Sequence, residues 1–173
     1  MLVFLVGYAG SGKSTMAKRL ARRLDCEVID TDKRVERAEG ATIADIFYYE
    51  GEEYFRCAER RALESIERDG GDVIVATGGG LPTWRDNMSW MHEHGVTIYL
   101  RRSAEQILSR LSEYGRQKRP MFRGKSDAEL LEFMRSQMRE RERFYSQADV
   151  VVECESLSDD DVVEYIINSL NIR

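Results

Sequence analysis

The feature that most constrains this chain is a phosphate-binding loop between an apolar strand and an amphipathic helix. Residues 2–6 form an unbroken apolar, β-prone run, which is typical of a strand buried on both faces of a parallel sheet. Gly7–Ser14 then matches the GxxxxGK(S/T) pattern. In the next segment Met16, Leu20 and Leu24 recur every fourth residue, as on one side of a helix. This order of elements predicts an α/β protein that binds a nucleotide through its phosphates.

The chemistry of the loop depends on its backbone. Its glycines let the chain curl so that successive N–H groups and the helix N-terminus face phosphate oxygens. We expect Lys13 to reach the β- and γ-phosphates and Ser14 to ligate magnesium. The predicted nucleotide-binding residues here are Gly10, Ser11, Gly12, Lys13, Ser14 and Thr15. The loop does not define the reaction, because GTPases, motors and kinases share it.

Strand-like and helix-like segments alternate along the rest of the chain. Further strands are predicted at Glu27–Ile29, Val73–Ala76, Val96–Leu100 and Asp149–Glu153. Helices are predicted from Lys33, from Thr42, from Gly51 through Arg68, and after cap signatures at Ser103, Ser126 and Ser158. This alternation predicts a three-layer α/β/α sandwich with a five-stranded parallel sheet, of the P-loop NTP hydrolase type, in a single domain spanning residues 1–173.

Composition narrows the class of function. The chain is 42% hydrophobic and 33% charged, as expected for a folded domain, and its net charge of -5 argues against a nucleic-acid partner. Cys26, Cys57 and Cys154 are widely separated, so neither a disulfide framework nor a zinc site is suggested. The apolar run at residues 2–6 is too short to span a bilayer. We expect a cytoplasmic monomer with no nucleic-acid or membrane partner.

Two carboxylates follow the second predicted strand. Asp30 and Asp32 would lie at the carboxyl edge of the sheet, where ligands of open α/β folds bind. Residues two apart in an extended segment point the same way, so both are expected to face the site. One carboxylate could hold magnesium through water while the other accepts a hydrogen bond from the hydroxyl to be phosphorylated. Spacing alone favours equally a helix N-cap followed by an acidic first turn.

A basic segment lies between the helices expected near Ser103 and Ser126. Residues 113–125 hold two glycines, a proline and several cations, among them Arg119. Charge pattern alone favours a solvated charged loop. In a chain with a phosphate loop, the same segment also suits a mobile lid.

Six pieces of sequence, taken together, resemble shikimate kinases over nearly the full chain. In order, they are Gly7–Ser14, Ile29–Asp32, Gly51–Arg56 with Glu59, Gly78–Gly80, Arg119 with Pro120, and Arg141 four residues before Tyr145. The resemblance implies an ATP-dependent phosphotransferase with an alcohol acceptor. It would transfer the γ-phosphoryl group of ATP to the 3-hydroxyl of shikimate, on the chorismate route to aromatic amino acids, with Mg2+ accompanying ATP.

The resemblance implies an acceptor site on helices at about residues 31–68. Asp32 would hold the ring hydroxyls of shikimate and act in catalysis, and Arg56 and Arg141 would clamp its carboxylate. A planar guanidinium pairs bidentately with a carboxylate, which agrees with those roles. Glu59 lies three residues after Arg56 on the same helix face and is expected to fix its rotamer. The backbone N–H groups of Gly78, Gly79 and Gly80 would contact the substrate, although a simple tight turn would explain them too.

The resemblance also completes the donor side. Segment 113–125 would close over ATP, with Arg119 reaching the phosphates as a catalytic cation beside Lys13. Arg110 would correspond to the arginine that stacks on adenine. Ser14 would hold magnesium directly, and Asp30 would hold it through water.

Two other hypotheses about the function compete with this one. Another small P-loop kinase, acting on gluconate or a nucleoside monophosphate, would share the same scaffold. A GTPase-like switch that binds partners would carry a guanine-reading NKxD motif, and the sequence contains none.

Overall fold

The computed structural model describes residues 1–69 and 71–171 and is built on a five-stranded parallel sheet. The strand order is β2-β3-β1-β4-β5. The strands are β1 (Leu2–Val6), β2 (Glu27–Asp30), β3 (Val73–Ala76), β4 (Val96–Arg101) and β5 (Val150–Glu153). The predicted sheet is confirmed, with small shifts at the strand ends.

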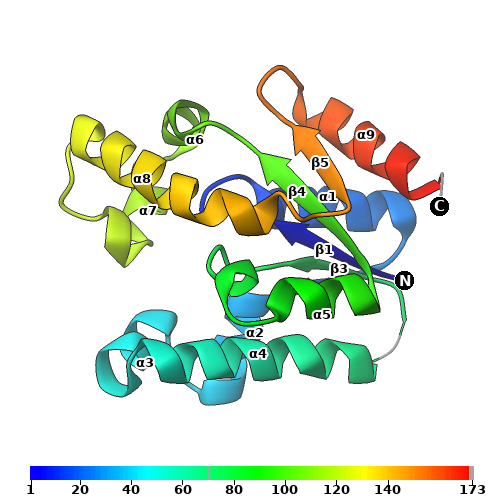
Figure 1. The fold of residues 1–173 in the computed structure, drawn as a ribbon, viewed down its shortest axis with the longest axis horizontal. Helices are drawn as coiled ribbons and strands as arrows, with labels where there is room; N and C mark the ends of the chain where they lie inside the picture. The colour runs from blue at the N-terminus through cyan, green and yellow to red at the C-terminus, as the bar shows by residue number, and fades with distance from the viewer. Residues whose placement is uncertain (70, 172–173) are drawn as a thin grey trace.

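Helices connect the strands and cover the sheet (Figure 1). They are α1 (Lys13–Leu24), α2 (Thr31–Glu39), α3 (Ile43–Glu50), α4 (Glu52–Asp69), α5 (Asn87–His94), α6 (Ala104–Arg110), α7 (Glu113–Gln117), α8 (Asp127–Tyr145) and α9 (Asp159–Asn171). Short 3₁₀ helices are η1 (Leu81–Thr83) and η2 (Pro120–Phe122). In the part of the chain so described, no helix has the length and apolar character needed to cross a bilayer.

Side-chain caps begin several helices where the sequence predicts them. Ser126 accepts a hydrogen bond from the Glu129 N–H, and the Glu129 carboxylate accepts one from the Ser126 N–H, so both halves of the capping box form. Ser103 also caps its helix, but there the Gln106 side chain turns away and donates to the carbonyl of Cys154. The residue that follows β5 is thereby tied to α6.

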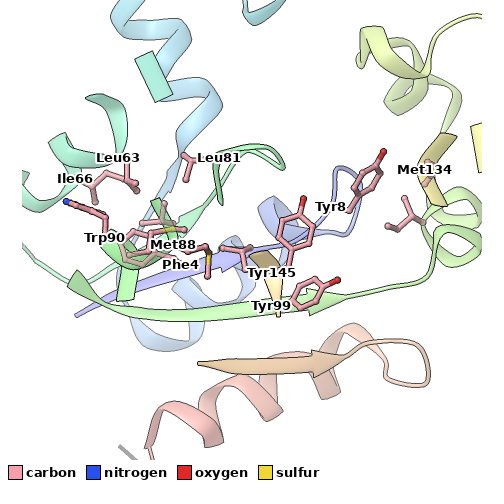
Figure 2. Packing of buried hydrophobic residues seen from close by; sticks show 14 of the residues in the cluster. Phe4, Tyr8, Leu63, Ile66, Leu81, Met88, Trp90, Tyr99, Met134 and Tyr145 are labelled. Atoms are coloured by element: carbon pink, nitrogen blue, oxygen red, sulfur yellow. The ribbon is translucent and has the colours of Figure 1, made fainter. Parts of the chain in front are cut away.

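Both faces of the central strands β3, β1 and β4 are buried, as their uninterrupted apolar sequences require, whereas the edge strands β2 and β5 are more exposed. Alternate β1 residues face opposite layers: Phe4 packs toward α4, α5 and α8, whereas Leu5 packs toward α1 and α9. Figure 2 shows Phe4 beside Trp90 and Met88, and the Phe4 and Trp90 ring centroids are 6.2 Å apart. Figure 1 shows α4 and α5 below the strands and α9 above them. The three layers of the predicted sandwich are therefore present.

The central position of β1 determines where a ligand can bind. Leu5 of β1 pairs with Ala76 of β3 on one side, and Val6 pairs with Tyr99 of β4 on the other. The chain leaves β1 toward β2 and β3 and later crosses to β4 and β5. The carboxyl end of β1 is thus a topological switch point, where open α/β sheets bind ligands.

Candidate active site

The phosphate loop is wrapped around the side chain of Lys13. Gly10 and Gly12 adopt φ angles of 82° and 97°, which glycine tolerates best, and the loop ends in α1. The Lys13 ammonium donates to the carbonyls of Gly7 at 2.7 Å and Tyr8 at 2.9 Å. Burial lowers the pKa of Lys13 to about 8, an effect that the Asp32 carboxylate opposes. The lysine is a buried cation held at the edge of the loop.

A cavity of about 360 Å³ opens beside this loop. The predicted nucleotide ligands Gly10, Gly12, Lys13, Ser14, Thr15, Arg110 and Arg119 line it. Ser11 is fully buried and does not line the cavity. On the acceptor side Asp32, Gly78 and Gly79 line the wall together with Asp30, while Arg56, Gly80 and Arg141 stand behind it. The structure therefore brings the donor and acceptor sets to one place.

The geometry expected for the two aspartates is wrong in one respect. The strand β2 ends at Asp30 and α2 begins at Thr31, so Asp30 and Asp32 do not lie on one extended segment. Asp30 is the N-cap of α2, with one oxygen near the Lys33 N–H at 3.3 Å and the other accepting from the Ser14 hydroxyl at 2.9 Å. Thr31 is buried at this turn and accepts a hydrogen bond from the Gly78 N–H at 2.8 Å, so the expectation that this N–H contacts the substrate is wrong.

Asp32 nevertheless borders the cavity, because the first turn of α2 carries it around Thr31. Burial raises the pKa of Asp32 to about 6, and the charge of Asp30 adds to this effect. Asp30 thus both caps the helix and lines the cavity, whereas Asp32 lines the cavity from the first turn of α2.

Two of the three glycines after β3 leave space that functional side chains occupy. A Cβ atom on Gly78 would lie 2.5 Å from Asp32 Oδ1. One on Gly79 would lie 3.5 Å from Arg141 Nη1, and one on Gly80 would lie 2.5 Å from Arg56 Nη1. Contacts below about 3 Å do not occur between real atoms of this kind, so Gly78 and Gly80 must lack side chains if Asp32 and Arg56 are to stay where they are.

The predicted pairing of Arg56 with Glu59 is confirmed. Arg56 Nη1 donates to Glu59 Oε2 at 2.6 Å, and the Glu59 side chain is 1% exposed. Burial raises the pKa of Glu59 to about 7, and the Arg56 guanidinium opposes this shift. The pair fixes the arginine head beside Gly80.

Arg141 and Arg119 contact neutral groups. Arg141 lies 5.7 Å from the centre of the Tyr8 ring and interacts with the Tyr145 hydroxyl, which donates to the Gly79 carbonyl. Arg119 Nη1 donates to the Gly115 carbonyl at 2.7 Å. These direct partners are neutral, so neither guanidinium is held in an ion pair by them and both can bind an anionic ligand.

Comparison with known proteins decides the family. The shikimate kinase family model matches residues 9–171. The chain is 38% identical over 168 residues to a shikimate kinase of Parabacteroides distasonis, covering 97% of this chain and 96% of that protein.

The chain belongs to the shikimate kinase family.

Solved structures agree with this assignment. A shikimate kinase from Bacteroides thetaiotaomicron superposes with a TM-score of 0.91 at 32% identity, covering 99% of this chain and 98% of that one. A shikimate kinase from Acinetobacter baumannii in complex with shikimate gives a TM-score of 0.87 at 29% identity, covering 98% of this chain and 92% of that one. The chain is therefore a kinase of this family, and the gluconate, nucleoside monophosphate and switch readings are not favoured.

In this family member, segment 113–125 is more ordered than a solvated loop. It contains α7 and η2, and Phe122 is fully buried with its ring stacked 6.4 Å from that of Tyr8. Arg116 pairs with Asp127 at the start of α8 at 2.5 Å. The role of the segment as a lid stays a prediction.

Several residues around the site had no role of their own in the sequence-based prediction. Thr77, Ser112 and Gly115 line the cavity, and Tyr145 holds the Gly79 carbonyl. Their only sequence signal is position: Thr77 directly follows β3, and the others flank residues already noted. Arg102 carries no such signal because it looks like an ordinary strand-end arginine.

Proposed function

We propose that this shikimate kinase family member transfers the γ-phosphoryl group of ATP to the 3-hydroxyl of shikimate, giving shikimate 3-phosphate and ADP. The observation that carries the proposal is the convergence of Asp32, Arg56 and Arg141 on the Gly78–Gly80 turn, at one end of the phosphate-loop cavity. An anionic, polyhydroxylated acceptor suits two guanidiniums and one carboxylate. The solved relative in complex with shikimate supports the choice of acceptor.

On the acceptor side, Arg56 and Arg141 bind the shikimate carboxylate and orient the ring. Asp32 accepts a hydrogen bond from the hydroxyl that is phosphorylated. With a pKa of about 6, Asp32 is largely ionised at neutral pH and still basic enough to draw on the hydroxyl proton. The oxygen is thereby oriented for in-line attack, so no covalent enzyme intermediate is needed.

On the donor side, the amides of residues 10–15 and the Lys13 ammonium hold the phosphates, and Arg119 approaches from segment 113–125. Loose phosphoryl-transfer transition states are stabilised mainly by positioning and by cations. Closure of that segment, with the helices at residues 31–68 presenting the acceptor, excludes water from ATP.

We further propose that Mg2+ accompanies ATP. The Ser14 hydroxyl and the Asp30 carboxylate lie together at the cavity wall, and such hard oxygen donors suit this ion. When bound, Mg2+ supplies charge neutralisation between the phosphates. Ser14 would hold it directly and Asp30 through water, while Arg110 at the cavity wall would stack on adenine.

The proposal predicts ADP release that depends on the acceptor. Purified protein with ATP and Mg2+ is assayed by coupled ADP release with shikimate, gluconate or a nucleoside monophosphate. We expect strong stimulation by shikimate alone. Arg56→Ala should abolish most of that stimulation. The control is Arg61→Ala, which should keep it, because Arg61 is an exposed residue of the same helix that pairs with Glu39. Equal turnover with the other acceptors would contradict the proposal.

The remaining predictions of the sequence fit this proposal without being required by it. They are a single kinase domain over residues 1–173, a monomeric state and a cytoplasmic location.

A further inference from the structure

Arg102 is a buried cation directly behind the phosphate loop, and the proposed mechanism does not use it. It follows β4, and its side chain is 0% exposed. Its Nε donates to the Ser11 carbonyl at 2.9 Å, and its Nη1 approaches the Cys154 carbonyl at 3.5 Å. Arginine stays ionised in proteins, and burying an ion costs free energy unless it is paired. A role in the site would explain why a charge is kept here.

The bond to Ser11 fixes the orientation of one peptide in the loop. In a trans peptide the C=O and the following N–H point in opposite directions. Because Arg102 holds the Ser11 oxygen on the far side of the loop, the Gly12 N–H points away from Arg102. Gly12 lines the cavity while Ser11 does not, so that N–H faces the cavity in which the phosphates would bind.

Asp159 connects this buried cation to the mouth of the cavity. Its Oδ1 lies 3.5 Å from Arg102 Nη2 and 3.1 Å from Arg110 Nη2. Its Oδ2 lies 3.7 Å from Arg19 on α1, the helix that begins at the phosphate loop. This carboxylate thus accepts a hydrogen bond from the guanidinium at the cavity wall and makes longer ion-pair contacts with the one behind the loop and the one on the loop's helix.

We propose that Arg102 and Asp159 form a positioning pair for nucleotide binding. Arg102 holds the Ser11–Gly12 peptide so that its N–H faces the phosphates, and Asp159 holds Arg102 and Arg110 in a fixed relation to each other. The inference rests on the proposed function only in taking ATP as the phosphoryl donor. Neither residue touches the acceptor half of the site, so the pair affects nucleotide and not shikimate.

The test compares Asp159→Asn with a matched control, Asp160→Asn. Asp160 is the next residue, is 90% exposed and pairs with Arg19 at 2.8 Å, without contact to Arg102 or Arg110. KM for ATP and for shikimate, kcat, calorimetric binding of MgADP, and thermal unfolding are measured for each protein. For Asp159→Asn we expect KM for ATP and Kd for MgADP to rise about tenfold, which corresponds to the free energy of one charge-assisted contact. KM for shikimate should stay within about twofold of wild type, and Asp159→Glu should recover most of the affinity for nucleotide.

The outcomes separate this inference from the proposed function. No shikimate-dependent turnover by the wild type overturns the proposed function. If the wild type turns over and Asp159→Asn and Asp160→Asn have equal nucleotide affinity, only the positioning pair is overturned. The same holds if both KM values rise in parallel and thermal stability falls. If Asp159→Asn does not fold, Arg102→Lys carries the same comparison. It keeps the charge but, lacking the planar fork, cannot hold Ser11, Cys154 and Asp159 together, so KM for ATP alone should rise.

Discussion

Replacing Gly80 by alanine should damage shikimate binding through Arg56 while leaving the fold intact. The backbone of Gly80 has φ -89° and ψ -16°, which alanine adopts without strain. The new Cβ would lie 2.5 Å from Arg56 Nη1 and 2.7 Å from Cζ. Because comfortable contacts between such atoms need about 3.5 Å, the guanidinium must move by roughly 1 Å. That displacement would break the proposed bidentate contact of Arg56 with the substrate carboxylate.

A hydrogen bond to a charged group contributes about 1.5–3 kcal/mol, so we expect KM for shikimate to rise roughly 10- to 100-fold in Gly80→Ala. KM for ATP should stay near the wild-type value, since Arg56 lies in the acceptor half. The assay is steady-state ADP release for wild type, Gly80→Ala, Arg56→Ala and the double variant. If the alanine acts through Arg56, it has no further effect once Arg56 is gone. Additive losses in the double variant, or an unchanged KM in Gly80→Ala, would refute the steric reasoning.

Three further predictions follow from the site. The value of kcat/KM for shikimate should fall as pH drops below about 6, where the buried Asp32 takes up a proton, and a pH–rate profile with no acid limb near that value would contradict the role of Asp32. Burial raises the pKa of Glu59 from 4.5 to about 7, so the native state binds more protons between these values; its contribution to stability is complete below about 4.5 and is lost as pH rises through about 7. The melting temperature should therefore fall less between pH 4 and pH 8 in Glu59→Gln than in wild type. Ser14→Ala should raise the Mg2+ concentration that gives half-maximal activity, measured at saturating ATP; an unchanged value would remove Ser14 from the metal site.

The fold could be predicted because its signals are local. An apolar run, a glycine loop and a helix with apolar residues at Met16 and Leu20 define one βα unit, and Ser126 with Glu129 marks another helix start within four residues. Each of these signals operates over a few residues, so tertiary contacts did not override them. Where a tertiary contact did intervene, the expected boundary moved: β5 begins at Val150 because Asp149 instead accepts hydrogen bonds from Thr97.

The site was harder to predict, because its geometry depends on contacts between distant segments. The hydrogen bond from the Gly78 N–H to Thr31 joins residues 47 apart, at the point where β2 ends and α2 begins. No rule based on local sequence spacing predicts such a contact. The place of Arg102 behind the loop likewise depends on a contact with Ser11 across 91 residues. The pairing of Arg56 with Glu59 was predictable because both lie on one helix turn.

Because β1 is the central strand, most of the proposed acceptor residues lie on one side of it and most of the other proposed nucleotide residues lie on the other side. Segments attached to β2 and β3 carry Asp32, Arg56 and the Gly78–Gly80 turn, whereas segments attached to β4 and β5 carry Arg110, Arg119 and Asp159. Two of the residues discussed depart from this division: Arg141 on α8 lies beside the acceptor turn although its helix precedes β5, and Asp30 at the end of β2 is proposed to hold the metal. Because Asp32, Arg56 and the Gly78–Gly80 turn all lie within residues 32–80, a change of acceptor would be concentrated in that stretch, and Arg141 is the proposed acceptor contact outside it.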